Sequence, residues 1–245
     1  MKNKLKIIGL IPARWGSTRF IGKPLAKIAG KSMIRRVYEQ AKKSKLLDNV
    51  CVVTDDGRIE KECLSNSLDC IFEELDCLTG TDRISHAMKN LKADIYVNIQ
   101  GDEPLINPDA IDEVLKNMIN DDSVEISNAF TKITEPYKVT DKDVVKVVFD
   151  RDLNALFYSR NAIPYPKDSN NIFFQQLGLY AFRKNALEKF SSFRPGKLEL
   201  VEGVEMLRFV ENGIKVKMVE VEDDGLSVDT PKDISYIENF LKKKK

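Results

Sequence analysis

Apolar residues along the chain fall into short runs that alternate with longer segments of helical periodicity. The runs have the length of buried strands and lie at 6–11, 50–54, 69–72, 94–99 and 124–130. Between them the spacing of apolar residues predicts helices near 32–45, 58–67, 80–91 and 108–119. The last of these helices begins with Asn107 as its N-cap and Pro108 just inside. Strands that alternate with helices indicate an α/β fold with a mostly parallel sheet flanked by helices, similar to Rossmann-like folds.

The pattern changes near residue 131, where paired strand-like runs replace the alternation. The runs VVKVVFD, LNALFYSR and FFQQLGLYAFR predict antiparallel ribbons with turns at 150–153 and in the polar stretch KDSNN. We interpret 131–183 as a β-rich arm inserted into a single domain that comprises residues 1–245. The chain then returns to a helix (about 199–211), a strand (KVKMVEV) and a last helix after VDTP. Ribbons without a covering helix expose an edge, so we expect the arm to pack against a second copy in a homodimer.

Loops that follow the strands carry the candidate chemistry, because parallel sheets bind ligands at the carboxyl ends of their strands. The first such loop, PARWGSTRFIGKP, combines glycines with Arg14, Arg19 and Lys23. Closely approaching backbone amides and these cations suit a polyphosphate. The spacing differs from GxxxxGK[ST] and from GxGxxG, which disfavours a P-loop NTPase and a Rossmann dinucleotide site. A solvated basic loop is the alternative interpretation.

Two carboxylates follow other apolar runs. Asp102 lies in QGDEP, directly after the predicted strand at 94–99, where a parallel-sheet enzyme would hold Mg²⁺ against a phosphate. Asp229 lies in SVDTP, and helix capping ahead of Thr230 and Pro231 is an equally good interpretation of it. If both carboxylates face the basic loop, they predict metal-assisted phosphoryl-type transfer.

Composition narrows the possible partners and the possible chemistry. Lys and Arg number 39 against 38 Asp and Glu, so no global charge predicts binding to nucleic acid or to a membrane surface. The chain has no membrane-length apolar stretch and opens without a signal peptide, so we expect a cytoplasmic protein. Cys51, Cys63, Cys70 and Cys77 form no CxxC pair, which favours reduced thiols over a zinc site. The one histidine, His86, lies on a predicted helix. We therefore expect any general acid or general base of this protein to be a carboxylate or a lysine.

The chain resembles the 3-deoxy-manno-octulosonate (Kdo) cytidylyltransferases, also called CMP-Kdo synthetases, along essentially its whole length. The matching blocks are IPARWGSTRFIGKPL, GKSMI, VVTDDGRI, GTDRI, VNIQGDEPLI, VVKVVFD, LFYSRNAIPY, LGLYAFR, the segment Leu198–Arg208 and VDTPKDI. The resemblance implies a nucleotidyltransferase-type α/β fold with a dimerisation arm. It also implies an enzyme that transfers CMP from CTP to an acidic sugar, releases pyrophosphate and uses Mg²⁺. The product would feed a bacterial surface polysaccharide, either lipopolysaccharide or capsule.

The resemblance also implies roles for individual residues. Asp102 and Asp229 match the metal ligands, and together with Arg14 and Lys23 they form the predicted catalytic set. The nucleotide-binding residues implied are Ala13, Arg14, Ser17, Thr18, Lys23, Thr54, Asp55, Thr81, Asp82, Arg83, Gln100 and Gly101. The sugar-binding residues implied are Arg160, Gln176, Tyr180, Glu205, Met206 and Arg208.

Two positions depart from the family pattern, and both lie on the sugar side. Gln176 stands where the family usually has histidine, and Met206 stands where it usually has glutamine. Loss of polar contacts to hydroxyls can change substrate choice, so a related acidic sugar is one alternative to Kdo. Neutral variation at positions that only pack is the other interpretation. A non-catalytic nucleotide-binding relative would tend to lose the metal carboxylates, and both are present. An enzyme that transfers a nucleotide to a neutral sugar phosphate would be expected to have a different residue pattern in the first loop.

Overall fold

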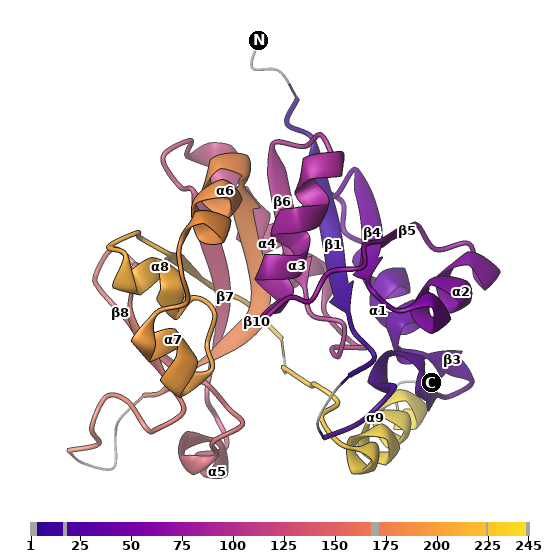
Figure 1. The fold of residues 1–245 in the computed structure, drawn as a ribbon. Coiled ribbons are helices and arrows are strands. Elements are labelled where there is room, and N and C mark those ends of the chain that lie inside the picture. The colour runs from indigo at the N-terminus through magenta and orange to yellow at the C-terminus, as the bar shows by residue number, and fades with distance from the viewer. Residues whose placement is uncertain (1–3, 17–18, 168–171, 224, 244–245) are drawn as a thin grey trace. The chain divides into compact units, whose positions relative to one another are not determined.

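The computed structural model describes residues 4–16, 19–167, 172–223 and 225–243 (Figure 1). They form two compact units. The first unit comprises the described residues of 1–112 and 223–245, and the second unit comprises those of 113–222. Helix α4 (Pro108–Asn120) contains the boundary between them. The predicted arm, 131–183, therefore lies within the second unit.

The first unit contains a parallel sheet with the strand order β6-β1-β4-β5. Its strands are β1 (Ile7–Ala13), β4 (Asn49–Thr54), β5 (Cys70–Phe72) and β6 (Ile95–Ile99). Side chains of β1 and β6 are buried almost without interruption, as expected for strands covered on both faces. The four apolar runs before residue 100 were thus correctly predicted as strands. Ala13 and Thr54 pair in register, so β1 and β4 end side by side.

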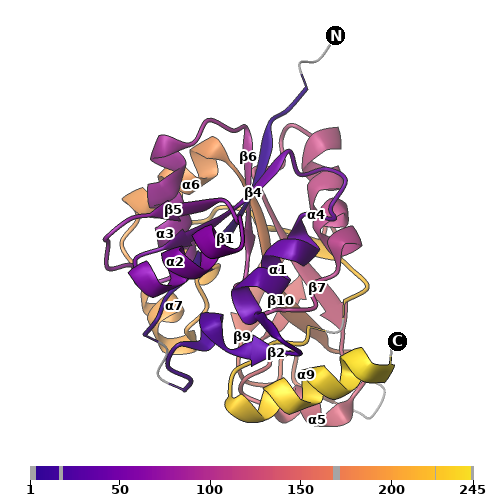
Figure 2. The ribbon, with the colours of Figure 1, turned by 90° about the vertical axis from the view of Figure 1, so that its right-hand side faces the viewer.

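Three helices of the first unit pack on the faces of this sheet: α1 (Met33–Ala41), α2 (Gly57–Ser65) and α3 (Gly80–Ala87). The last helix, α9 (Pro231–Lys243), contacts β2 instead. α1 and α3 both contact β1 and lie on either side of it in Figure 2. This placement follows from the right-handed crossovers of parallel strands. α1 connects β1 to β4 in one direction across the sheet, and α3 connects β5 to β6 in the opposite direction, so the two helices lie on opposite faces. Short elements complete the unit: η1 (Lys23–Leu25), η2 (Met88–Asn90) and the hairpin of β2 (Lys27–Ile28) and β3 (Lys31–Ser32).

The second unit is built on antiparallel strands, as its sequence pattern predicts. β10 (Phe174–Arg183) pairs antiparallel with β7 (Ile126–Lys132) and β8 (Lys146–Phe149), and β8 pairs with β9 (Ala155–Ser159). β11 (Lys217–Glu220) adds to β7 in parallel, so this sheet is mixed. Phe130, Phe149 and Phe174 form an aromatic cluster with ring centroids 4.8 to 5.3 Å apart. This cluster joins β7, β8 and β10 through side-chain packing.

One helix predicted in the second unit differs from the helices observed there. The continuous helix expected over about 199–211 is two short helices, α7 (Lys197–Glu202) and α8 (Leu207–Glu211). Gly203 ends α7 in the left-handed conformation, with φ 62° and ψ 40°. A glycine adopts this conformation without the steric penalty of a Cβ, so it stops the helix. The remaining helices are α5 (Pro136–Thr140) and α6 (Lys184–Ser192).

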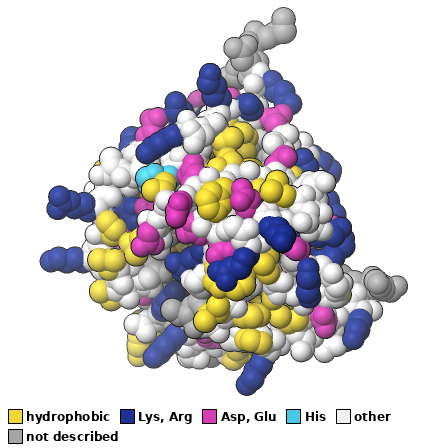
Figure 3. All heavy atoms as spheres, turned by 45° about the vertical axis from the view of Figure 1, so that its right-hand side comes forward, with side chains coloured by type: hydrophobic (Ala, Val, Ile, Leu, Met, Phe, Trp, Pro, Cys, Tyr) yellow, Lys and Arg dark blue, Asp and Glu magenta, His cyan; other side chains and the backbone are white. Residues whose placement is uncertain are grey.

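The surface carries charges of both signs. On the face drawn in Figure 3, Lys and Arg side chains are interspersed with Asp and Glu and with apolar side chains. Such mixing produces no extended field of one sign on that face. Of the helices in the described part of the chain, none has the length and apolar character that crossing a bilayer requires.

Candidate active site

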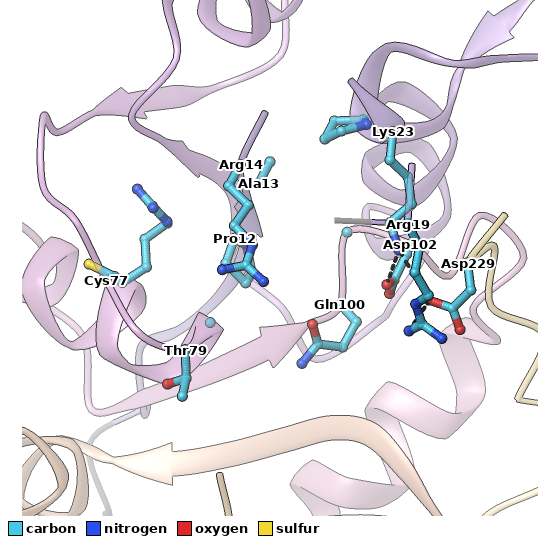
Figure 4. A pocket seen from close by; sticks show the side chains of 14 residues that line it. Pro12, Ala13, Arg14, Arg19, Lys23, Cys77, Thr79, Gln100, Asp102 and Asp229 are labelled. Carbon is cyan, nitrogen blue, oxygen red and sulfur yellow. Dashed lines mark hydrogen bonds and ion pairs between the residues drawn. The ribbon is translucent and has the colours of Figure 1, made fainter. Parts of the chain in front are cut away.

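A cavity of about 260 Å³ opens in the first unit where β1 and β6 end. The end of β1, the loop that follows β1, and η1 form part of its walls (Figure 4). The start of α3, the loop after β6 and Asp229, which lies just before α9, form the rest. This is the edge at which a parallel sheet is expected to bind a ligand. The described lining residues are Pro12, Ala13, Arg14, Arg19, Lys23, Pro24, Cys77, Thr79, Gly80, Arg83, Gln100, Gly101, Asp102 and Asp229.

The loop after β6 lies so close to β1 that only glycine fits at position 101. A Cβ on Gly101 would lie 2.8 Å from the carbonyl oxygen of Pro12. Because that oxygen belongs to the backbone of a central strand, it cannot turn aside. Gly101 therefore lets Gln100 and Asp102 reach the cavity beside the end of β1.

The two predicted metal ligands converge on one lysine. The Lys23 Nζ donates to Asp102 Oδ2 at 2.7 Å and to Asp229 Oδ1 at 3.5 Å. Arg19 Nη2 donates to Asp229 Oδ1 at 2.9 Å, and Figure 4 shows these four side chains gathered together. The backbone also joins the two carboxylates, because Val228 N donates to Asp102 O at 2.9 Å. Residues that are more than 120 positions apart thus share one site, as the sequence predicts.

Capping of α9 is carried out by other residues than Asp229. The Asp233 carboxylate accepts hydrogen bonds from Asp229 N at 2.9 Å and from Thr230 N at 2.7 Å. Burial alone would raise the pKa of Asp233, but these hydrogen bonds hold the pKa below its usual range. The Asp229 carboxylate is left to face Arg19 and Lys23. The interpretation of Asp229 as a capping side chain is therefore wrong.

This arrangement fits a hard divalent cation. The Lys23 ammonium already lies where Asp102 and Asp229 converge, so a positive charge suits that point. Carboxylate oxygens are the ligands that Mg²⁺ prefers, and Mg²⁺ usually keeps only one or two of them alongside water and substrate phosphates. In the described residues no group of at least three His, Cys, Asp or Glu could hold a metal ion by itself. A magnesium ion here would therefore need oxygen atoms from its substrate or from water.

The start of α3 forms the opposite wall. Thr79 caps the helix in a capping box with Asp82, an arrangement that the sequence signals as a threonine three residues before an acid. Arg83 is 4% exposed and donates through Nη2 to Asp55 Oδ2 at 2.6 Å. Its Nη1 is buried without a hydrogen-bond partner and belongs to a residue that lines the cavity. The positive charge of Arg83 in the cavity wall suits an anionic ligand, and Nη1 gains an acceptor only if the atoms covering it move.

The predicted nucleotide residues divide into two groups. Ala13, Arg14, Lys23, Arg83, Gln100 and Gly101 line the cavity. Thr54, Asp55, Thr81 and Asp82 do not line it and instead support the loops: Thr54 Oγ1 accepts from Asp56 N at 3.2 Å, and Thr81 Oγ1 accepts from Asn98 Nδ2 at 3.1 Å. Ser17 and Thr18 lie outside the described residues. The lining residues that the sequence analysis did not single out are Pro12, Pro24, Cys77, Thr79 and Gly80.

The positions of the cysteines and of the histidine suit structural roles. All four cysteines are free thiols. Burial raises the pKa of Cys77, the one lining thiol among the described residues, so it remains protonated near neutral pH. Burial also raises the pKa of Cys51 to about 12. His86 lies on α3 and is not among the described lining residues.

All the residues predicted to bind the sugar lie in the second unit. Arg208 is 2% exposed, and its guanidinium makes a two-point ion pair with Glu199 at 2.8 and 2.6 Å while it stacks on Phe190 at 3.8 Å. Arg160 donates through Nε to the carbonyl of Glu202 at 2.7 Å. These two arginines thus have partners within the protein, and their contact with a sugar stays a prediction.

The two positions that depart from the family pattern face inward. Gln176 is 8% exposed and donates through Nε2 to the Tyr180 hydroxyl at 2.8 Å. Met206 is fully buried at the residue before α8. Glu205, its neighbour, is half-buried and accepts through its carbonyl from Arg208 N at 3.1 Å. Both variant side chains thus make packing or hydrogen-bond contacts within the second unit.

Comparison with known proteins shows the family to which the chain belongs. The family model for cytidylyltransferases matches residues 8–218. The 3-deoxy-manno-octulosonate cytidylyltransferase of Chlamydia caviae is 39% identical over 96% of this chain and 94% of that protein. The one from Desulfosudis oleivorans is 41% identical over 97% of this chain and 98% of that protein. The solved structure of a CMP:2-keto-3-deoxy-manno-octonic acid synthetase complexed with CTP has a TM-score of 0.93, is 34% identical, and covers 98% of this chain and 100% of that chain. The chain therefore belongs to the cytidylyltransferase family, among the 3-deoxy-manno-octulosonate cytidylyltransferases.

Proposed function

We propose that this protein transfers CMP from CTP to Kdo and releases pyrophosphate. The observation that carries the proposal is the convergence of Asp102 and Asp229 on Lys23 in a cavity that Arg14 also lines. Such a combination of carboxylates and cations suits a magnesium–triphosphate. Similarity to a synthetase that binds CTP supports cytosine as the base.

The reaction we propose is a direct displacement at the α-phosphate. The anomeric oxygen of the sugar forms a bond to the α-phosphorus and loses its proton, while the bond from the α-phosphorus to pyrophosphate breaks and its electron pair leaves with the pyrophosphate. Asp102 and Asp229 would hold Mg²⁺, which when bound stabilises charge on the phosphates. Arg14 and Lys23 offset the charge of the leaving pyrophosphate. Arg83 adds a further positive charge to the wall of this cavity.

Kdo is the acidic sugar that we favour. The alternative of a related acid depended on Gln176 and Met206 facing the substrate. The engagement of Gln176 with Tyr180 and the full burial of Met206 support roles in packing. We further propose that the protein works in the cytoplasm as a homodimer and supplies a surface polysaccharide pathway, because these properties follow from the family resemblance.

The test is pyrophosphate release by the purified protein with Mg²⁺ and CTP. Kdo is compared with a panel of other 2-keto-3-deoxy acids, and UTP is compared with CTP. Turnover with CTP and Kdo is expected, and turnover only with another acid would make Gln176 and Met206 determinants of specificity. No turnover with any acid would favour a protein that only binds nucleotide.

A matched pair of variants assigns the activity to this site. Asp102→Asn removes a predicted metal ligand and should lower kcat by at least about 100-fold. Asp109→Asn is the control, because Asp109 has a side chain that is 77% exposed and pairs with Lys45 only at 3.9 Å. Equal activity of the Asp102→Asn variant and the wild type would refute the assignment.

A further inference from the structure

Trp15 holds both ends of the loop that carries the cations. Its carbonyl accepts from Gly22 N at 3.1 Å, which closes the loop at its base. Its ring occupies the space beside Gly22, where a Cβ would lie 2.8 Å from Cη2 and 3.0 Å from Cζ2 of the indole. Gly22 has φ 70°, a conformation that glycine adopts readily. Arg14 precedes Trp15 directly and Lys23 follows Gly22 directly, so the two predicted phosphate cations are the immediate neighbours of this contact.

The indole also stacks against α2. The Arg58 guanidinium carbon lies 3.5 Å from the centroid of the Trp15 ring. Arg58 is fixed in turn by Asp56, which accepts from Nε at 2.9 Å and from Nη2 at 2.7 Å. The same carboxylate caps α2 through Arg58 N. Asp55, the preceding residue, pairs with Arg83 in the cavity wall. Trp15 therefore connects the cation loop to the loop after β4 that supports the nucleotide pocket.

We propose that Trp15 is a positioning residue for the CTP triphosphate, an inference that rests on the proposed function. Trp15 is half-buried and is not one of the described residues that line the cavity, so it acts through Arg14 and Lys23 and not by contact with the nucleotide. Cations whose neighbouring residues are fixed before the ligand arrives lose less conformational entropy on binding. The stacked indole thus favours tight binding of the triphosphate and correct placement of the leaving pyrophosphate.

Substitutions at both partners test this role by calorimetric titration with CTP and Mg²⁺. Trp15→Ala should weaken CTP binding by about tenfold and raise the KM for CTP more than it lowers kcat, while the KM for Kdo at saturating CTP stays unchanged. Trp15→Phe keeps an aromatic face for Arg58 and should restore most of the affinity. Arg58→Ala removes the stacking cation together with its ion pair to Asp56 and should weaken CTP binding by about two- to fivefold. Phe72→Ala is the control, because Phe72 is a partly exposed aromatic of the same unit that does not line the cavity.

The composition of the chain allows a spectroscopic check. Trp15 is the only tryptophan, so intrinsic indole emission reports on this loop alone. The wild type should show a saturable emission change with CTP and Mg²⁺, and Arg58→Ala should show it at higher CTP concentration. If Trp15→Ala does not fold, Arg58→Ala decides the question, because its side chain is 57% exposed.

The outcomes separate the two proposals. A folded Trp15→Ala variant that binds CTP within twofold of the wild type would overturn the positioning role and leave the proposed function intact. Equal weakening by Phe72→Ala would also overturn it, because the effect would then be general. A wild type that binds no CTP would refute the proposed function, and the inference would fall with it.

Discussion

Gly101→Ala is the substitution whose effect the structure predicts most directly. The new methyl group would lie 2.8 Å from Pro12 O, whereas carbon and oxygen atoms in ordinary contact are at least about 3.3 Å apart. The loop after β6 would therefore have to move by roughly half an ångström, because β1 is held by β4 and β6 on its two sides. Asp102 is the next residue and would move with it.

The expected cost has two parts. Overpacking of this kind destabilises a protein by about 1–3 kcal/mol, which for a chain of this length lowers the Tm by roughly 3–10 °C. Displacement of Asp102 should lower kcat by up to about 100-fold, since misplacement of a catalytic group by an ångström has that effect. The two parts are measured by thermal unfolding and by steady-state pyrophosphate release.

Gly57→Ala is the matched control. Gly57 is the first residue of α2, and a Cβ there meets no atom within 4 Å. Because alanine has the higher helix propensity, this variant should match the wild type in activity and be equal or slightly higher in stability. Full activity of Gly101→Ala, or an equal loss in both variants, would refute the steric reasoning.

Three further substitutions test other contacts. Lys23→Met should lower kcat/KM for CTP by about 100-fold, because it leaves two carboxylates and a triphosphate without their shared cation. Steady-state kinetics measure this effect, and Lys116→Met, at an exposed lysine, is the control. Arg208→Met should destabilise the fold by about 3–5 kcal/mol in urea unfolding, because the buried carboxylate of Glu199 loses its partner. Asp233→Ala should cost about 1 kcal/mol at neutral pH. The pKa of Asp233 is depressed in the folded state, so its contribution is present above the usual aspartate pKa of 3.8 and is lost as pH falls through the depressed value.

Each of these expectations has a contrary result. An unchanged KM and kcat in Lys23→Met would remove the lysine from the phosphate site. If Glu199→Met combined with Arg208→Met were as unstable as Arg208→Met alone, the loss would come from packing and not from an unpaired charge. A stability difference between wild type and Asp233→Ala that stays constant on acidification would contradict the capping role of the ionised carboxylate.

The sequence predicted the strands and the helices that position the nucleotide side of the site. Asp102 follows β6, as predicted, because the carboxyl ends of parallel strands are where such residues reach a ligand. The prediction that Asp229 also follows a strand is wrong, because β11 ends at Glu220. Asp229 reaches the site through the segment in which Val228 N donates to Asp102 O. The break at Gly203 was missed although a glycine in an apolar helical pattern is a known stop signal, because the apolar spacing continued on either side of it.

Other features depend on tertiary contacts that periodicity cannot supply. The inward direction of Gln176 depends on β10, whose register against β7 shifts between Gln176 and Tyr180. The stacking of Arg58 on Trp15 joins α2 to the loop after β1, two segments that are far apart in sequence. The bond between Thr81 and Asn98 likewise needs α3 to lie against β6. Local pattern identifies which residues are apolar or charged, and packing decides which partners they meet.

The unpaired Nη1 of Arg83 offers a route to inhibitor design. Folding has already removed this nitrogen from water. A small molecule that displaces the atoms covering Nη1 and presents a carbonyl or carboxylate oxygen to it therefore gains a charge-assisted hydrogen bond without the usual desolvation penalty on the protein side. The guanidinium is held by Asp55, so it offers a fixed direction for that bond. A fragment anchored at Arg83 could then be extended along the cavity as far as Gln100 and end before the charged cluster of Lys23, Asp102 and Asp229 (Figure 4).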